Sequence, residues 1–191
     1  MDDVRLPRLR FVSGALLVAL LVAAPGARAG DPPAFDARGG MELAADAARS
    51  WAPDAYLTYV ENDDDLDPQG AAVRWGYLFY SPSLDQSRAY SVRGGKIVTA
   101  ENLDMKFEAP ALATGWIDSD RALAAAEASV GSAFRTKYQG RLTTMLLMRG
   151  AFQEGDPDET TWTLVYTSPS APALFVMVDA TGAKVRRTWR G

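Results

Sequence analysis

The stretch WTLVYTSPSAPALFVMVDATGAKV, residues 162–185, decides the fold because it combines strand-like alternation with clear turns. Its two apolar runs flank a Ser-Pro-Ser connection, and an Asp-Ala-Thr-Gly turn closes the second run. The earlier stretch WGYLFYSPSLDQSRAYSVRGGKIV, residues 75–98, has nearly the same order of strands and turns. The shared order predicts an internal repeat of antiparallel hairpins.

An Ala-rich helical segment precedes each stretch, which extends the repeat to a helix followed by strands. The first segment begins at Glu42 and ends before Pro53, and the second begins at Asp118 or Ser119 and stops at Gly131. Apolar side chains at helical spacing form the faces expected to pack on the strands. These faces are Leu43, Ala47 and Trp51 in the first helix, and Leu123, Ala126 and Val130 in the second.

We therefore predict an α+β fold of two tandem units, each a helix packed on a small antiparallel β-sheet of three or four strands. The units span residues 41–107 and 117–191, with a linker at 108–116 and a flexible lead-in at 30–40. The alternative is a single cone-shaped domain of cystatin-like or nuclear-transport-factor-like fold, in which a curved sheet wraps an apolar pocket.

Residues 1–29 have the pattern of a signal peptide. Three arginines precede an apolar run at 11–24, and the segment ends in Ala27-Arg28-Ala29, so we predict cleavage after Ala29. Retention as a membrane anchor is the alternative. No other apolar run is long enough to span a bilayer, so we expect a periplasmic or secreted protein without stable membrane insertion.

The composition excludes many kinds of chemistry. With neither Cys nor His, the chain lacks thiol nucleophiles, disulfides, Cys or His zinc sites and every Ser-His-Asp arrangement. The chain has 20 basic and 24 acidic residues, and residues 1–29 hold four of the basic and two of the acidic ones. The remainder is acidic, which disfavours nucleic acid as a partner, and we interpret the basic end Arg186–Arg190 as a solvated strand end.

The second unit resembles the PepSY domains of exported bacterial proteins. The resemblance rests on IDSDRALAAA at 117–126 and on the closing hairpin LFVMVDATG at 174–182, followed by Lys184 and Val185. The first unit has Arg-Gly-Gly-Lys at 93–96 in place of the Asp-Ala-Thr-Gly turn.

The resemblance implies a non-catalytic interaction module of the cell envelope or secreted space, with an exported protease as a partner that it regulates or inhibits. The chain has no His-Glu-x-x-His, so the protease would be a separate protein. The alternative function is binding of a small apolar ligand or peptide. We expect no enzyme activity and no cofactor, although a carboxylate pair stays open because the fold sets its partners.

Two acidic loops could place oxygens around Ca²⁺. An EF-hand counted from Asp63 would need Gly and Glu where the chain has Pro68 and Arg74, so solvated loops are the favoured interpretation and no metal site is predicted. The loop residues are Asp63, Asp64, Asp65 and Asp67 in the first, and Glu154, Asp156, Asp158 and Glu159 in the second.

Two Ser-Pro-Ser segments, at 81–83 and 168–170, lie in neither Gly-x-Ser-x-Gly nor Ser-x-x-Lys, so we interpret them as turns rather than nucleophiles. Strand aromatics are expected in the core, the alternative being an exposed aromatic groove that binds a peptide or small apolar ligand. They are Trp75, Tyr77, Phe79, Trp162 and Tyr166.

Overall fold

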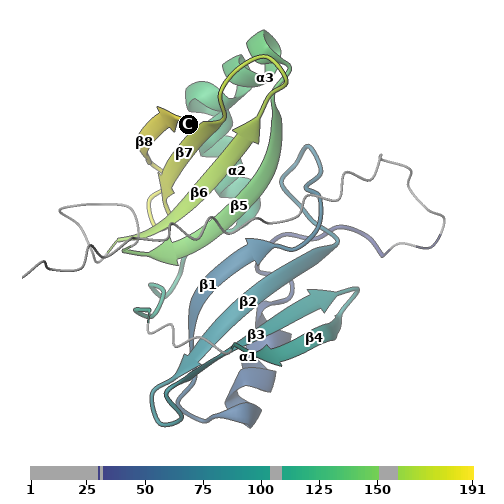
Figure 1. The fold of residues 1–191 in the computed structure, drawn as a ribbon, viewed down its shortest axis with the longest axis vertical. Helices are drawn as coiled ribbons and strands as arrows, with labels where there is room; N and C mark the ends of the chain where they lie inside the picture. The colour runs from purple at the N-terminus through teal and green to yellow at the C-terminus, as the bar shows by residue number, and fades with distance from the viewer. Residues whose placement is uncertain (1–29, 31, 104–108, 151–158) are drawn as a thin grey trace, which may run out of the picture. The chain divides into compact units, whose positions relative to one another are not determined.

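One antiparallel sheet of eight strands, with helices on one of its faces, forms the described part of the chain (Figure 1). This computed structural model describes residues 30, 32–103, 109–150 and 159–191, and the described residues from 32 onward form one compact unit. The predicted signal peptide, residues 1–29, lies outside the described residues.

The strands follow the alternation of large apolar and polar side chains along the sequence. In chain order they are β1 (Tyr56–Asn62), β2 (Arg74–Ser81), β3 (Gln86–Arg93), β4 (Lys96–Asn102), β5 (Arg141–Arg149), β6 (Thr160–Thr167), β7 (Leu174–Asp179) and β8 (Val185–Arg190). The tight turn predicted between β3 and β4 is present, with both Gly94 and Gly95 at positive φ.

The sheet order β4-β3-β2-β1-β5-β6-β7-β8 contradicts the predicted fold class. Two tandem units, each a helix on its own small sheet, were expected, but β1 and β5 pair with each other at Tyr59↔Met148 and Glu61↔Leu146. This pairing joins all the strands into one sheet. The physical reason is that β1 and β5 would each be an unpaired edge strand in a separate sheet, and their pairing satisfies those backbone groups.

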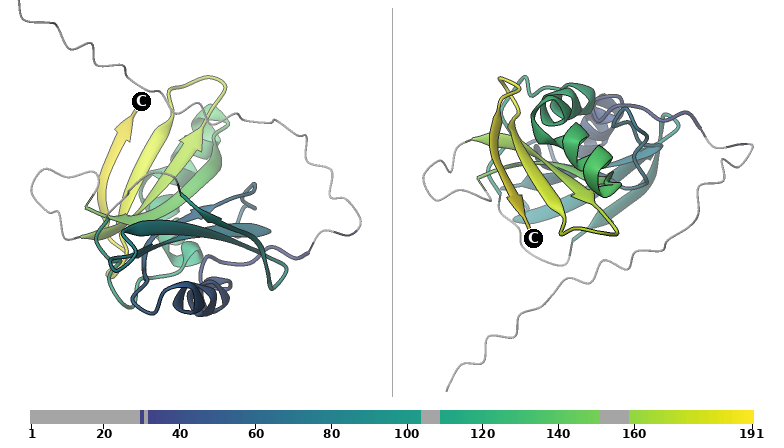
Figure 2. Two further views of the ribbon diagram at one scale, coloured as in Figure 1. Left: turned by 60° about the horizontal axis from the view of Figure 1, so that its bottom comes forward. Right: turned by 90° about the horizontal axis from the view of Figure 1, so that it is seen from above.

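Helix α1 (Met41–Trp51) packs against β1–β4, while α2 (Ser119–Ala126) packs against β6 and β7. Figure 2 shows α1 on the same side of the strands as the other helices. The predicted face of α1 is wrong in part, because Ala44 and Ala48 are buried whereas Leu43 is 38% exposed. Small alanines let the helix axis approach the sheet closely.

The second helix is longer than the sequence predicted. Asp118 caps α2 by accepting a hydrogen bond from the Ser119 backbone N–H (2.8 Å), as expected. The helix does not stop at Gly131: a π-helical turn η1 (Glu127–Gly131) continues into α3 (Ser132–Tyr138). An added Cβ at Gly131 would lie 2.6 Å from the Tyr166 hydroxyl, so glycine here permits close helix–sheet contact.

The core lies between the helices and the sheet and is rich in aromatic side chains. Trp75 and Trp162 are fully buried and meet edge to face, with ring centroids 6.2 Å apart. The lead-in segment that was predicted to be flexible contributes to this core: Phe35 pairs with Ala72 through two backbone hydrogen bonds, and Ala37 is buried. The predicted aromatic core is thus confirmed for Trp75 and Trp162.

Candidate functional site

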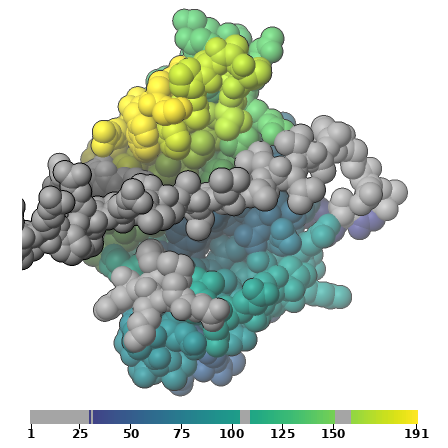
Figure 3. All heavy atoms as spheres, viewed as in Figure 1, coloured from purple at the N-terminus to yellow at the C-terminus, as the bar shows by residue number. Residues whose placement is uncertain are grey.

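The sheet face that points away from the helices carries the candidate site, and we call it the open face. Strand side chains alternate between faces, so Thr163 and Val165 point to the open face while Trp162, Leu164 and Tyr166 point to the core. Figure 3 shows atoms of β6–β8, in yellow-green and yellow, at the surface on this side of the molecule.

An apolar groove of about 350 Å³ crosses the open face of β5–β8. Four apolar side chains and two polar ones line it. They are Leu146 on β5, Thr163 and Val165 on β6, Phe175 on β7, and Arg187 and Trp189 on β8. The volume is at the lower end of the range of about 300–1,000 Å³ for small-molecule pockets.

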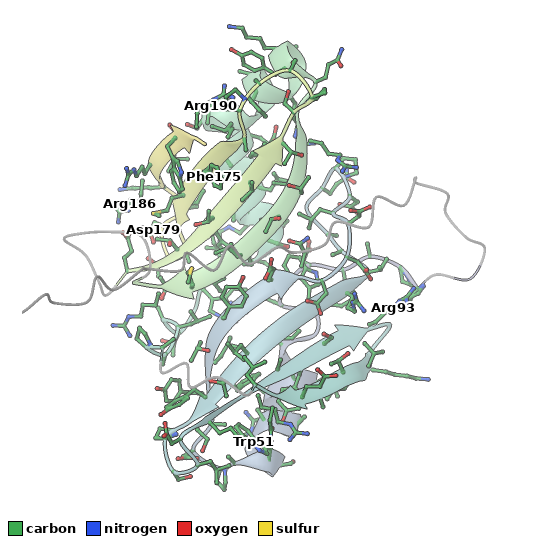
Figure 4. The ribbon with its side chains drawn as sticks, viewed as in Figure 1. Trp51, Arg93, Phe175, Asp179, Arg186 and Arg190 are labelled. Carbon is green, nitrogen blue, oxygen red and sulfur yellow. The ribbon has the colours of Figure 1, made fainter. Side chains whose placement is uncertain are left out.

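A pair of stacked rings forms one wall of the groove. Phe175 on β7 and Trp189 on β8 are register partners, and their rings lie 5.0 Å apart with an interplanar angle of 7°. The Arg187 guanidinium lies 5.5 Å from the centre of the Trp189 ring, within the range of cation–π contact. This wall is therefore flat and aromatic, and Arg187 gives it a positive charge at its β8 edge. Phe175 is labelled in Figure 4.

A buried polar atom lies beneath the groove. Thr163 is 2% exposed, and its hydroxyl has no hydrogen-bond partner among the described residues. Its register neighbours Leu146 and Met177 offer side chains that cannot supply a strong hydrogen bond. A buried hydroxyl without a partner costs about 1–3 kcal/mol, and its burial keeps it out of contact with a ligand in the groove.

An acidic side chain lies next to the groove on β1. Glu61 is the register partner of Leu146, and its carboxylate accepts a hydrogen bond from the Tyr59 hydroxyl (2.6 Å). Burial raises the pKa of Glu61 above its ordinary value of 4.5, and burial together with the Glu61 charge raises the pKa of Tyr59. The β1 end of this face is therefore acidic, while the β8 end is basic.

A second groove, of about 390 Å³, lies beside the lead-in. Its lining contains no charged side chain and consists of Pro32, Pro33, Ala34, Phe35, Gly39, Val92, Gly94 and Gly95. With neither a charged group nor a buried hydroxyl in this lining, nothing there selects a ligand.

The first acidic loop serves the fold. Asp63 accepts a hydrogen bond from the Ser91 hydroxyl and pairs with Arg74, which also contacts Asp64 (3.3 Å). Asp67 accepts two backbone hydrogen bonds within its own turn, from residues 69 and 71. Among the residues that the structure describes, no three acidic side chains are grouped in a way that could hold a metal ion.

Most of the second acidic loop, residues 151–158 with Glu154, Asp156 and Asp158, lies outside the described residues. Glu159 is described, and its carboxylate pairs with the Arg186 guanidinium (2.6 Å). Arg186 also reaches Asp179 (3.3 Å), a contact that can be followed in Figure 4.

Both Ser-Pro-Ser segments are turns, although one has an acidic partner that sequence reasoning missed. Asp54 accepts hydrogen bonds from the Ser81 hydroxyl and the Ser83 backbone N–H, both at 2.7 Å. These bonds hold the pKa of Asp54 below its ordinary value, the Ser81 bond contributing most, so its carboxylate is a weak base suited to fixing the turn. In the other segment, Ser168 and Ser170 both donate to the Tyr138 carbonyl.

Two carboxylates near the start of α2, those of Asp36 and Asp118, also have structural roles. Asp118 accepts from the Arg38 backbone N–H (3.0 Å), and Asp36 accepts from the Ser119 hydroxyl (3.4 Å). Burial is the main cause that raises the pKa of both Asp36 and Asp118. Neither groove described above is lined by a carboxylate, so the geometry offers no acid–base pair facing a ligand.

Sequence reasoning placed the strand aromatics correctly but missed the groove. All five predicted aromatics are buried, so none of them forms an exposed groove. A signal was nevertheless present in the sequence. Val165, Phe175 and Trp189 occupy strand positions whose side chains point away from the core, and all three are apolar. A strand that is apolar on both faces has a second surface to cover.

No protein-family model matches the chain, and no curated protein matches it. The PepSY resemblance therefore stays a prediction. The chain is similar in fold to a "putative lipoprotein" from Clostridium difficile 630, whose crystal structure superposes with a TM-score of 0.53 over 79% of this chain and 92% of that chain. The two sequences are 11% identical, so the likeness concerns the fold alone.

Within the described ranges, the helices are all too short or too polar to cross a bilayer.

Proposed function

We propose that this protein is a non-catalytic binding protein whose open-face groove takes an apolar ligand. One observation carries the proposal: the groove is lined mainly by apolar side chains, and the stacked rings of Phe175 and Trp189 form one of its walls. Ligand grooves are typically lined by apolar and aromatic side chains, with a few polar groups that fix the ligand's orientation.

The proposal follows the ligand-binding alternative of the sequence analysis. A regulatory action on an exported protease stays a prediction, since no feature of the site favours it. For location we propose the cell envelope or secreted space. The support is the signal-peptide pattern of residues 1–29, together with the fold similarity to a protein described as a lipoprotein. Sequencing the N-terminus of exported material should find Gly30 first, whereas a membrane-bound chain that still begins at Met1 would contradict cleavage.

The binding proposal is tested by titrating the purified protein with a neutral, apolar naphthylamine dye and following its fluorescence. Trp189→Ala should lower dye affinity about tenfold, because truncating an aromatic anchor typically costs more than 1 kcal/mol. The matched control is Leu84→Ala, an apolar side chain that is 50% exposed at the β2–β3 turn and distant from the groove in the sheet order. Equal affinity in the two variants would contradict binding at the groove.

A further inference from the structure

We propose that the ligand of the open-face groove is a small apolar carboxylate, with its carboxylate at Arg187 and its apolar tail running toward β5. This inference rests on the proposed function, because it names the chemical class that the same groove would take. It is argued from the charge at the groove ends and the apolar lining.

Arg187 is the cationic group available to a ligand at the groove. It is exposed, no carboxylate of the described residues pairs with it, and its guanidinium contacts the Trp189 ring. The other two arginines of β8 are engaged elsewhere. Arg186 pairs with Glu159 and Asp179, and Arg190 lies over the Phe134 ring at 4.3 Å on the helix side of the sheet. A carboxylate matches the planar fork of a free guanidinium.

The charges of the open face also set the direction of the ligand. Glu61, Leu146, Thr163, Met177 and Arg187 lie in one cross-strand row from β1 to β8. At roughly 4.8 Å per strand, the acidic and basic ends of this row are about 19 Å apart. The negative end repels an anion and the positive end attracts it, so the carboxylate belongs at β8 and the tail toward β5.

Thr163 lies between these ends, two strands from Arg187. The exposed guanidinium binds the carboxylate at the β8 end of the groove, and the tail begins over Thr163. The tail then covers Leu146 and Val165, and the Phe175–Trp189 pair forms the wall beside it. Every group in the lining is used by this one kind of molecule.

Calorimetric titration of the purified protein with decanoate, decanol and decylamine tests the inference. We expect decanoate to bind about fivefold more tightly than decanol, and decylamine most weakly, because an exposed ion pair contributes up to about 1 kcal/mol. Arg187→Gln should abolish the preference for decanoate over decanol. Arg190→Gln, a matched change on the same strand but on the other face, should keep it.

The remaining outcomes separate this inference from the proposed function. Equal binding of decanoate and decanol would overturn the carboxylate preference and leave the apolar groove as a binding site. Binding of neither compound would overturn both. Capture of an apolar peptide that decanoate cannot displace would overturn the small-molecule occupant.

Discussion

The two halves of the sheet, β1–β4 and β5–β8, have similar cores and different open faces. Trp75 on β2 and Trp162 on β6 are both fully buried, and each indole N–H donates to a backbone carbonyl before a helix, that of Phe35 (2.7 Å) or Ile117 (2.8 Å). In each half, a tryptophan thus places an apolar ring in the core and has its indole N–H paired.

The open faces meet different requirements. Over β2 and β3, Asp63 from the loop after β1 forms a polar cover with Arg74 and Ser91. Gly76 leaves room for this cover, since an added Cβ would lie 2.6 Å from the Asp63 carboxylate. On β5–β8 the same face is an apolar groove. The difference teaches that burial fixes the helix side of both regions, whereas the open side is free to differ, and the proposed ligand site lies on that side.

The largest expected effect tests the similarity of the two cores. Trp75→Ala and Trp162→Ala should each lower the free energy of unfolding by about 4 kcal/mol, because each removes a fully buried ring. Chemical denaturation of both single variants and of the double variant measures this. The double variant should lose less than the sum, since the rings contact each other at 6.2 Å. Strict additivity would contradict a shared core.

The next prediction contrasts the two helices. Leu123 on α2 is 4% exposed and Leu43 on α1 is 38% exposed, although the sequence pattern gives them the same role. Leu123→Ala should therefore cost about 3 kcal/mol of unfolding free energy, and Leu43→Ala less than about 0.5 kcal/mol. Urea denaturation at matched pH provides the measurement. A similar loss in both variants would restore the helix face predicted from sequence.

Two glycines give a smaller contrast. Gly131→Ala should cost about 1–2 kcal/mol, because the new Cβ would meet the Tyr166 hydroxyl at 2.6 Å. Adding Tyr166→Phe should recover part of that loss. At Gly40 the new Cβ would meet both the Tyr77 hydroxyl (2.6 Å) and the Val92 Cβ (2.9 Å), so Tyr77→Phe should recover little. Thermal denaturation of the four variants distinguishes the two sites.

The smallest effect concerns pH at the boundary of the groove. Burial raises the pKa of Glu61 above 4.5, so the folded protein holds this proton more tightly than the unfolded chain does. The wild type should then lose stability relative to Glu61→Gln as pH rises above about 4.5. The variant should melt about 2 °C higher at neutral pH and equally at pH below about 4. The matched control is Glu101→Gln, which removes an exposed carboxylate on β4.

Local features of the fold could be predicted from the sequence because neighbouring residues determine them. The alternation along residues 75–81 and 162–166, the Gly94-Gly95 turn and the Asp118 cap each depend on a few adjacent residues, and all are present. The sequence also narrowed the possible chemistry of a site, because a chain without Cys and His has no thiol or imidazole group.

Only the tertiary structure decided how these elements combine. The β1–β5 ladder joins residues more than eighty positions apart, and no local pattern specifies which edge strand finds which. The groove depends on the register within successive hairpins, which brings Thr163 of β6 beside Leu146 of β5 and Phe175 of β7 beside Trp189 of β8. Alternation determines which side chains share a face, but the hydrogen-bond register between strands determines which of them become neighbours.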